Sequence, residues 1–324
     1  MVIILYLCGM KVATIGFFDG VHKGHQFLLR QVVKEAKKVG GIPACITFDC
    51  PPREVVRSPK RDEWSMKQLT TLPEKIQLLQ EIGVEEVQVL HFTPEIAKMS
   101  AYDFMREMLK GRWDVGVLLI GYDHRFGHNR EEGFEDYVRY GQEIGIQVLQ
   151  AQVYEEDFIT VSSSLIRETL LQGRVTDSRK LLGYDYFIDG VVVDGVKVGR
   201  KLGYPTANIE VPAEKLIPCD GVYAVQAALN PSLTLPQGEG KRNPPLYNGM
   251  LNIGWRPTFN GNKRTIEVNL FDFDGDIYSK HITLHFIDFL RPEQKFNSPE
   301  ALIAQLALDE QKAREVLAKG QCKM

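Results

Sequence analysis

The first half of the chain alternates short apolar runs with segments in which apolar residues recur every three or four positions. The short runs predict buried strands, and the longer segments predict helices. The predicted strands are 12–15, 42–48, 87–92, 115–120 and 146–153. The predicted helices are 26–39, 73–81, a segment from residue 100, and 131–143. This alternation predicts a doubly wound parallel sheet, Rossmann-like, with helices on both faces.

The second half of the chain has a different pattern, in which strand-like runs are separated by turns rich in glycine or proline. This pattern is typical of an antiparallel barrel or sandwich, and we expect an antiparallel β-barrel. A terminal helix is expected from Ser298 and Pro299, a capping residue followed by a proline suited to the first turn. The change of pattern near residue 183 predicts two domains, residues 1–183 and 184–324. The runs are 186–193, 221–229, 246–253, 265–271 and 281–290.

The composition is that of an ordinary globular protein with about two domains: 324 residues, 44% hydrophobic and 25% charged. A net charge of −3 gives no electrostatic reason to expect nucleic acid as a partner. No apolar run approaches a membrane span, and no signal peptide is recognised. The five cysteines are scattered, which fits a reducing compartment. We therefore expect a cytoplasmic protein without nucleic-acid or membrane partners, and the sequence leaves open whether it forms a homo-oligomer.

The turn between the first strand and the first helix carries two histidines, His22 and His25, after Gly16 and Gly20. The N–H groups at a helix start favour an anion there. Both imidazoles can meet one phosphate and stabilise the charge that develops in phosphoryl or nucleotidyl transfer. Two other interpretations stay open: polar residues on the rim of a tight turn, and a metal site, for which no nearby cysteine or carboxylate cluster completes the ligands.

Two further segments of the first half place polar residues at a strand end and at a helix start. Asp123 follows the fourth predicted strand, where it either contacts a nucleotide or caps the turn. Ser162, Ser163 and Ser164 precede a helical segment and either cap it or bind phosphate oxygens. In the second case, Arg167 in that helix would supply a fixed cation for a polyphosphate.

The second half contains one glycine-rich stretch, Gly-Arg-Lys-Leu-Gly-Tyr-Pro-Thr-Ala-Asn-Ile at residues 199–209. Its glycines let backbone N–H groups approach a phosphate closely. Thr206 and Asn208 are two residues apart, so in extended backbone their oxygens share a face and suit Mg²⁺ shared with phosphates. From the residues alone, the alternative is a structural loop that leads into an edge strand.

These motifs together resemble a known family. The string Gly-Phe-Phe-Asp-Gly-Val-His-Lys-Gly-His-Gln at 16–26 resembles the nucleotidyltransferase signature, and more narrowly the FMN adenylyltransferase module of bacterial riboflavin kinase/FAD synthetase. The serine run with Arg167 resembles the second motif of that superfamily. Leu-Gly-Tyr-Pro-Thr-Ala-Asn at 202–208 resembles the riboflavin kinase signature. The segments 252–259, 265–273 and 289–296 follow in family order, and the resemblance spans about residues 11–317.

The resemblance implies that the C-terminal domain phosphorylates riboflavin with ATP to give FMN. It implies Mg²⁺ as the metal, with Thr206 and Asn208 as its ligands, and Glu267 as the general base toward the ribityl 5′-hydroxyl. The implied ATP or flavin contacts of this domain are Gly199, Lys201, Gly203, Pro205 and Arg291.

The resemblance also implies that the N-terminal domain adenylylates FMN with ATP, giving FAD and pyrophosphate. In that reaction His22, His25 and Arg167 stabilise the transition state. The implied ATP contacts are Gly16, Phe17, Asp19, Gly20, Asp123, Ser162, Ser163 and Ser164.

The chain departs from the family pattern at three places. Cys50-Pro51-Pro52 stands where a histidine between two prolines is usual, His124 where another aromatic residue is expected, and Ser164 where threonine is usual. These departures motivate one alternative, a riboflavin kinase with an impaired adenylyltransferase domain. A second alternative is a flavin-binding module without turnover, although binding alone would need neither a base nor a metal site.

Overall fold

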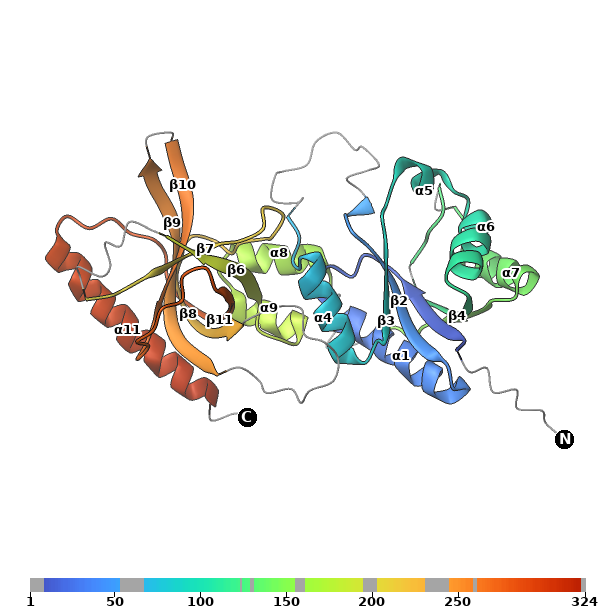
Figure 1. Cartoon of the computed structure of the whole chain (residues 1–324), viewed down its shortest axis with the longest axis horizontal. Helices are drawn as coiled ribbons and strands as arrows, with labels where there is room; N and C mark the ends of the chain where they lie inside the picture. Colours follow the sequence, from blue (N-terminus) through green and yellow to red (C-terminus); the bar gives the residue numbers. More distant parts are fainter. Residues whose placement is uncertain are drawn as a thin grey trace. The chain divides into compact units, whose positions relative to one another are not determined.

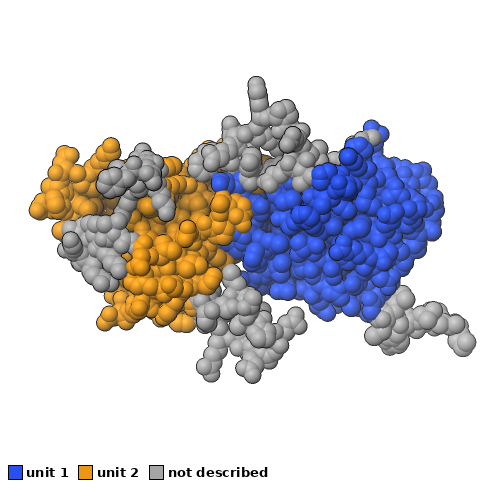
Figure 2. Space-filling model, turned by 45° about the horizontal axis from the view of Figure 1, so that its top comes forward, with its two compact units in different colours: residues 1–163 blue, residues 164–324 orange. Residues whose placement is uncertain are grey.

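The computed structural model describes residues 9–52, 67–122, 124–128, 131–154, 161–194, 203–230, 245–258 and 261–321. The chain divides into two compact units, Met1–Ser163 and Ser164–Met324, which are coloured separately in Figure 2. Three residues of the predicted sites, Asp123, Gly199 and Lys201, lie outside the described residues. Among the helices that the structure describes, none has both the length and the apolar character needed to cross a membrane.

The first unit contains a five-stranded parallel sheet with the strand order β3-β2-β1-β4-β5. The strands are β1 (Lys11–Ile15), β2 (Ile42–Phe48), β3 (Glu86–Leu90), β4 (Val115–Ile120) and β5 (Gln147–Gln150). The prediction of a doubly wound parallel sheet is confirmed. Because the strand order reverses between β1 and β4, the carboxyl ends of these two strands form the place where such sheets bind ligands.

Helices cover both faces of this sheet (Figure 1). The helices α1 (Lys23–Val39) and α4 (Leu72–Ile82) pack on one face, where Leu29 and Leu79 join a common apolar cluster. The other face is covered by the π-helix η2 (Phe104–Arg112) and by α7 (Phe134–Ile144). Burial on both faces explains why the strands are continuous apolar runs. Among the described residues of this unit there are also three short helices: η1 (Asp19–Val21), α5 (Pro94–Lys98) and α6 (Ala101–Asp103).

The second unit contains a closed antiparallel barrel with the strand order β10-β7-β6-β11-β8-β9. The prediction of an antiparallel β-barrel is confirmed. The terminal helix, α11 (Pro299–Gln321), packs its residues Ala313 and Leu317 against β8 and β9 (Figure 1). The strands are β6 (Phe187–Val193), β7 (Ala207–Glu210), β8 (Gly221–Asn230), β9 (Leu246–Thr258), β10 (Gly261–Leu270) and β11 (His281–Arg291).

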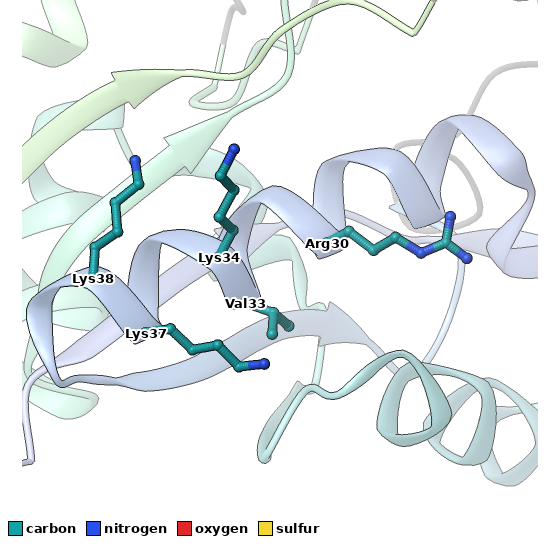
Figure 3. Close-up of a pocket in the computed structure, with 5 residues that line it drawn as sticks. All are labelled: Arg30, Val33, Lys34, Lys37 and Lys38. Carbon is teal, nitrogen blue, oxygen red and sulfur yellow. The ribbon is translucent and has the colours of Figure 1, made fainter.

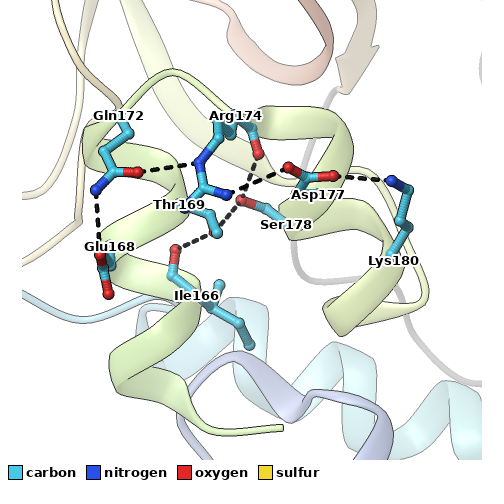
Figure 4. A network of polar contacts seen from close by, with 8 residues as sticks. All are labelled: Ile166, Glu168, Thr169, Gln172, Arg174, Asp177, Ser178 and Lys180. Carbon is cyan, nitrogen blue, oxygen red and sulfur yellow. Dashed lines mark hydrogen bonds and ion pairs between the residues drawn. The ribbon is translucent and has the colours of Figure 1, made fainter. Parts of the chain in front are cut away.

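Two helices precede the barrel, α8 (Ser163–Leu171) and α9 (Val175–Leu182). A buried polar contact joins them, because Thr169 Oγ1 lies 2.7 Å from Ser178 Oγ (Figure 4). The Cys219 N–H, just before β8, donates to the Leu170 carbonyl oxygen at 3.2 Å and ties α8 to the barrel. The division into units therefore falls before these helices, whereas the sequence pattern placed the domain boundary after them.

Candidate functional site

The turn between β1 and α1 has an uncommon backbone conformation. Phe18 and Val21 have φ values of 53° and 34°, a region that residues other than glycine seldom occupy, and Gly20 has φ 76°. A Cβ atom on Gly16 would lie 3.0 Å from the Phe18 ring. Such conformations persist only where the surroundings fix them, and they cluster at ligand sites. This turn lies at the carboxyl end of β1, where the fold favours a ligand.

Asp19 shapes this turn from inside the protein. Its side chain is 3% exposed, and its Oδ1 accepts hydrogen bonds from the N–H groups of Leu69 and Thr70 at 2.9 and 3.2 Å. Thr70 Oγ1 in turn accepts the Gly20 N–H at 3.1 Å. Ser163 Oγ donates to the Asp19 carbonyl oxygen at 2.9 Å. The structure thus brings Ser163 of the second motif to the turn of the first motif.

The two histidines stack on each other at the start of α1. Their ring centroids are 3.6 Å apart with an interplanar angle of 18°, and His22 is the N-cap, accepting the His25 N–H on Nδ1 at 3.4 Å. Because Nδ1 of His22 accepts, the neutral ring carries its proton on Nε2. The Nδ1 atom of His25 is buried and has no hydrogen-bond partner among the described residues. Nε2 is therefore the nitrogen of each ring that suits a ligand.

Burial favours the neutral form of both histidines. Burial lowers the pKa of His22 to about 4. Burial also lowers the pKa of His25 well below its usual value, and the charges of His22, Lys75 and His124 lower it further. A bound phosphate would favour the charged form of both rings, since a nearby opposite charge raises the pKa of histidine. The pair therefore offers neutral N–H donors in the free protein and gains proton affinity when an anion binds.

Tyr137 of α7, which the sequence analysis does not single out, fixes the loop after β4. Its ring stacks on Phe126 at a centroid distance of 4.4 Å. Its hydroxyl accepts the Phe126 N–H at 3.0 Å and lies 3.1 and 3.2 Å from the carbonyl oxygens of Phe126 and Glu132. This loop is the segment for which the sequence predicted nucleotide contacts. Tyr137 therefore fixes the conformation of a loop at a candidate nucleotide site.

We expect Tyr137→Phe to lower the free energy of unfolding of the first unit by about 1–3 kcal/mol, because it leaves the partly buried Phe126 N–H without its partner. Urea unfolding measures the change. Tyr140→Phe, on the same helix, is the control, with an expected change below about 0.5 kcal/mol. Equal effects of the two variants would contradict the assigned role.

The second constellation of predicted residues lies where β7 and β10 pair. Glu267 is the register partner of Asn208, so their side chains share a face of the sheet. Thr206 Oγ1 donates to Glu267 Oε2 at 3.5 Å, and Thr265 Oγ1 donates to Oε1 at 3.3 Å. Glu267 is only 6% exposed, so it is not a solvent-facing glutamate. The structure therefore brings together three predicted residues, Thr206, Asn208 and Glu267.

This donor set fits a hard divalent cation. It consists only of oxygens, from a hydroxyl, an amide and a carboxylate, as Mg²⁺ prefers when it also binds substrate phosphates. Among the described residues, no group of three His, Cys, Asp or Glu side chains could hold a metal. Gly203 and Pro205 precede β7. The Pro205 carbonyl oxygen accepts a hydrogen bond from Asn269 Nδ2 at 2.7 Å, which fixes the backbone just before Thr206.

Arg291 and Arg167 occupy different environments. Arg291, at the end of β11, makes a bidentate ion pair with the buried Asp309 of α11, with Nε and Nη2 within 2.7–3.0 Å of its oxygens. This pair fixes α11 to the barrel.

Arg167 is buried on α8 and, with Ser164, belongs to the second unit. The roles that the sequence assigned to these residues toward ligands stay predictions.

Comparisons with known proteins match both halves of the chain. Residues 8–165 match the FAD synthetase family model, and residues 182–317 match the riboflavin kinase family model. The bifunctional riboflavin kinase/FMN adenylyltransferase of Listeria monocytogenes is 35% identical over 311 residues, covering 95% of this chain and 93% of that protein. The protein of the same name from Escherichia coli is 35% identical over 304 residues, covering 94% and 92%.

A solved structure, described as a macrolide-efflux protein from Streptococcus pneumoniae, has a TM-score of 0.82, 31% identity and 94% coverage of both chains. The doubly wound unit with paired histidines matches one transferase family model, and the barrel with its buried glutamate matches another, so the chain is a two-part nucleotide-dependent transferase. The chain belongs to the bifunctional riboflavin kinase/FMN adenylyltransferase family.

Proposed function

We propose that this chain makes FMN and then FAD. The barrel unit transfers the γ-phosphoryl group of ATP to riboflavin, and the doubly wound unit transfers the adenylyl group of a second ATP to FMN, releasing pyrophosphate. The observation that carries this proposal is that one chain matches both family models and is 35% identical over 95% of its length to a bifunctional relative. ATP, riboflavin and FMN are the substrates.

For the kinase reaction, we assign Glu267 as the general base. It accepts the proton of the ribityl 5′-hydroxyl while that oxygen attacks the γ-phosphorus and ADP leaves. The hydroxyls of Thr206 and Thr265 support this assignment, because they hold the carboxylate in one orientation. We assign Thr206 and Asn208 as ligands of Mg²⁺, which supplies charge neutralisation of the phosphates when bound. Gly199, Lys201, Gly203, Pro205 and Arg291 are the proposed ATP or flavin contacts.

For adenylyl transfer, we assign His22 and His25 as donors to the α-phosphate. A phosphate oxygen of FMN attacks the α-phosphorus, the bond to the pyrophosphate oxygen breaks, and no covalent enzyme intermediate forms. The two imidazoles and Arg167 stabilise the charge that develops on the transferred group. The stacked arrangement supports the assignment, because it places both rings at the N-terminus of α1, where an anion is favoured. The proposed ATP contacts are Gly16, Phe17, Asp19, Gly20, Asp123, Ser162, Ser163 and Ser164.

Isotope tracing tests the two transfers separately. With riboflavin and γ-labelled ATP, the label should appear in FMN. With FMN and α-labelled ATP, the label should appear in FAD. Label in FMN only would support the alternative of an impaired adenylyltransferase, and flavin binding without either product would support a binding module.

We expect Thr206→Ala to weaken the apparent affinity of the kinase reaction for Mg²⁺ by about 10–100-fold, because it removes one proposed oxygen ligand. Initial rates of FMN formation against Mg²⁺ concentration measure this change. Thr265→Ala is a matched control, because it removes the other hydrogen bond to Glu267 without removing a proposed ligand. Thr206→Ser should restore the Mg²⁺ dependence. Equal shifts for Thr206→Ala and Thr265→Ala would contradict the metal assignment.

A further inference from the structure

Lys75 is a buried lysine in the first unit, with only 1% of its surface exposed. It lies on α4, three residues after Leu72 and four before Leu79, so it occupies the side of the helix that packs on the sheet. Lysine is almost never fully buried unless its ammonium has partners. Its contacts therefore indicate what this position does.

The Lys75 ammonium joins the ends of two neighbouring strands. Its Nζ donates to the Phe17 carbonyl oxygen and to the Phe48 carbonyl oxygen, each at 3.0 Å, and lies 4.1 Å from the centroid of the Phe17 ring. Phe48 is the last residue of β2, and Phe17 is the second residue after β1. Thr47 Oγ1 also donates to the Phe17 carbonyl oxygen at 3.1 Å. Lys75 thus holds the first part of the turn that leads to the histidines.

Charged and titratable groups of several elements surround this ammonium. The carboxylates of Asp19 and Asp49 and the cysteines Cys45 and Cys50 face it, and His25 of α1 responds to its charge. Burial lowers the pKa of Lys75 to about 8, although the two carboxylates oppose this change. The cation therefore predominates at neutral pH and is lost above about pH 8.

We propose that Lys75 is a positioning residue of the adenylyl-transfer reaction: by holding the Phe17 and Phe48 carbonyl oxygens, its ammonium fixes the turn that presents His22 and His25 to the α-phosphate. This inference rests on the proposed function of the first unit. Lys75 acts through the backbone of the turn and not by contact with ATP. Effective positioning matters because a displacement of about 1 Å at a reacting centre lowers a rate by about 100-fold.

The test compares Lys75→Met and Lys75→Arg in the full chain. Lys75→Met keeps an unbranched side chain that is one atom shorter and removes its charge and its donors, so kcat for FAD formation from FMN should fall by about 10–100-fold. FMN formation from riboflavin should not change, because that reaction belongs to the other unit. Lys34→Met is the control, since Lys34 is exposed on the outer side of α1 beside Arg30, Lys37 and Lys38 (Figure 3). This control should keep the kcat of the unchanged protein.

The pH profile separates positioning from a purely structural role. In the unchanged protein, kcat for FAD formation should fall above about pH 8, because the neutral amine of Lys75 holds the two carbonyl oxygens by weaker hydrogen bonds than the ammonium does. Lys75→Arg keeps the charge throughout this range, so its profile should stay flat from about pH 7 to about pH 9.5. A fall caused by another facing group, such as the Cys50 thiol, would persist in Lys75→Arg.

Three results would overturn the inference: an unchanged kcat for Lys75→Met, a fall above pH 8 that persists in Lys75→Arg, or a flat profile in the unchanged protein. The pH profile of the unchanged protein needs no variant, so a flat profile would overturn the inference even if neither variant folds. Failure of the proposed function is a separate outcome, because the unchanged protein would then form no FAD at any pH.

Discussion

Glu267→Gln is expected to lower kcat for FMN formation by about 10²–10⁴-fold, because an amide cannot accept the proton of the ribityl hydroxyl. The substitution conserves the shape of the side chain, and its oxygen can still accept a hydrogen bond from Thr206 or Thr265. The expected loss is therefore one of chemistry and not of folding. Chromatographic separation of flavins after incubation with riboflavin and ATP measures it.

FAD formation from supplied FMN should be unchanged in Glu267→Gln, since that reaction takes place in the other unit. Glu210→Gln is the matched control, because Glu210 is an exposed carboxylate on the neighbouring strand β7. Its kinase rate should equal that of the unchanged protein. If Glu267→Gln kept full kinase activity, the assignment of the general base would be wrong.

His25→Ala is expected to have the reverse pattern: FAD formation falls by about 10²–10³-fold, and FMN accumulates. The substitution removes one proposed N–H donor to the α-phosphate and also the ring that stacks on His22 at 3.6 Å. Rates of FAD formation from FMN and ATP measure the loss. His128→Ala, an exposed histidine of the same unit, is the control and should keep both activities.

The choice of replacement at His25 tests which nitrogen acts. A glutamine amide reaches the position of Nε2, whereas an asparagine amide reaches the position of Nδ1. Because Nδ1 of His25 is buried without a partner among the described residues, His25→Gln should retain more FAD formation than His25→Asn. The opposite order would contradict the proposed orientation of the ring.

Much of the fold follows from the apolar pattern. The predicted strands 12–15 and 115–120 match β1 and β4 within one residue, because burial on both faces leaves an uninterrupted apolar run. The first helix begins at Lys23, three residues before the predicted start, because His22 caps it and apolar spacing does not report a cap. Strand β5 ends at Gln150, whereas the prediction extended to residue 153. Apolar residues continue past the last residue of β5 that pairs with β4.

The site could be predicted only where chemistry is local in the sequence. His22 and His25 are three residues apart, so their shared helix start is visible in the sequence, and the structure stacks them. Lys75 reaches the turn across 58 residues, and no local pattern reports such a contact. The sequence gives one indication of its role: Lys75 lies on the apolar side of a predicted helix, between Leu72 and Leu79. Similarly, Tyr137 resembles any core aromatic residue until its hydroxyl is seen to bind the loop after β4.

The most direct test of the account is a time course with purified protein, riboflavin, ATP and Mg²⁺, in which the flavins are separated by chromatography. The account predicts that FMN appears first and that FAD then forms from it. FMN that never proceeds to FAD would contradict the assignment of the first unit, and the absence of both products would contradict the proposed function as a whole.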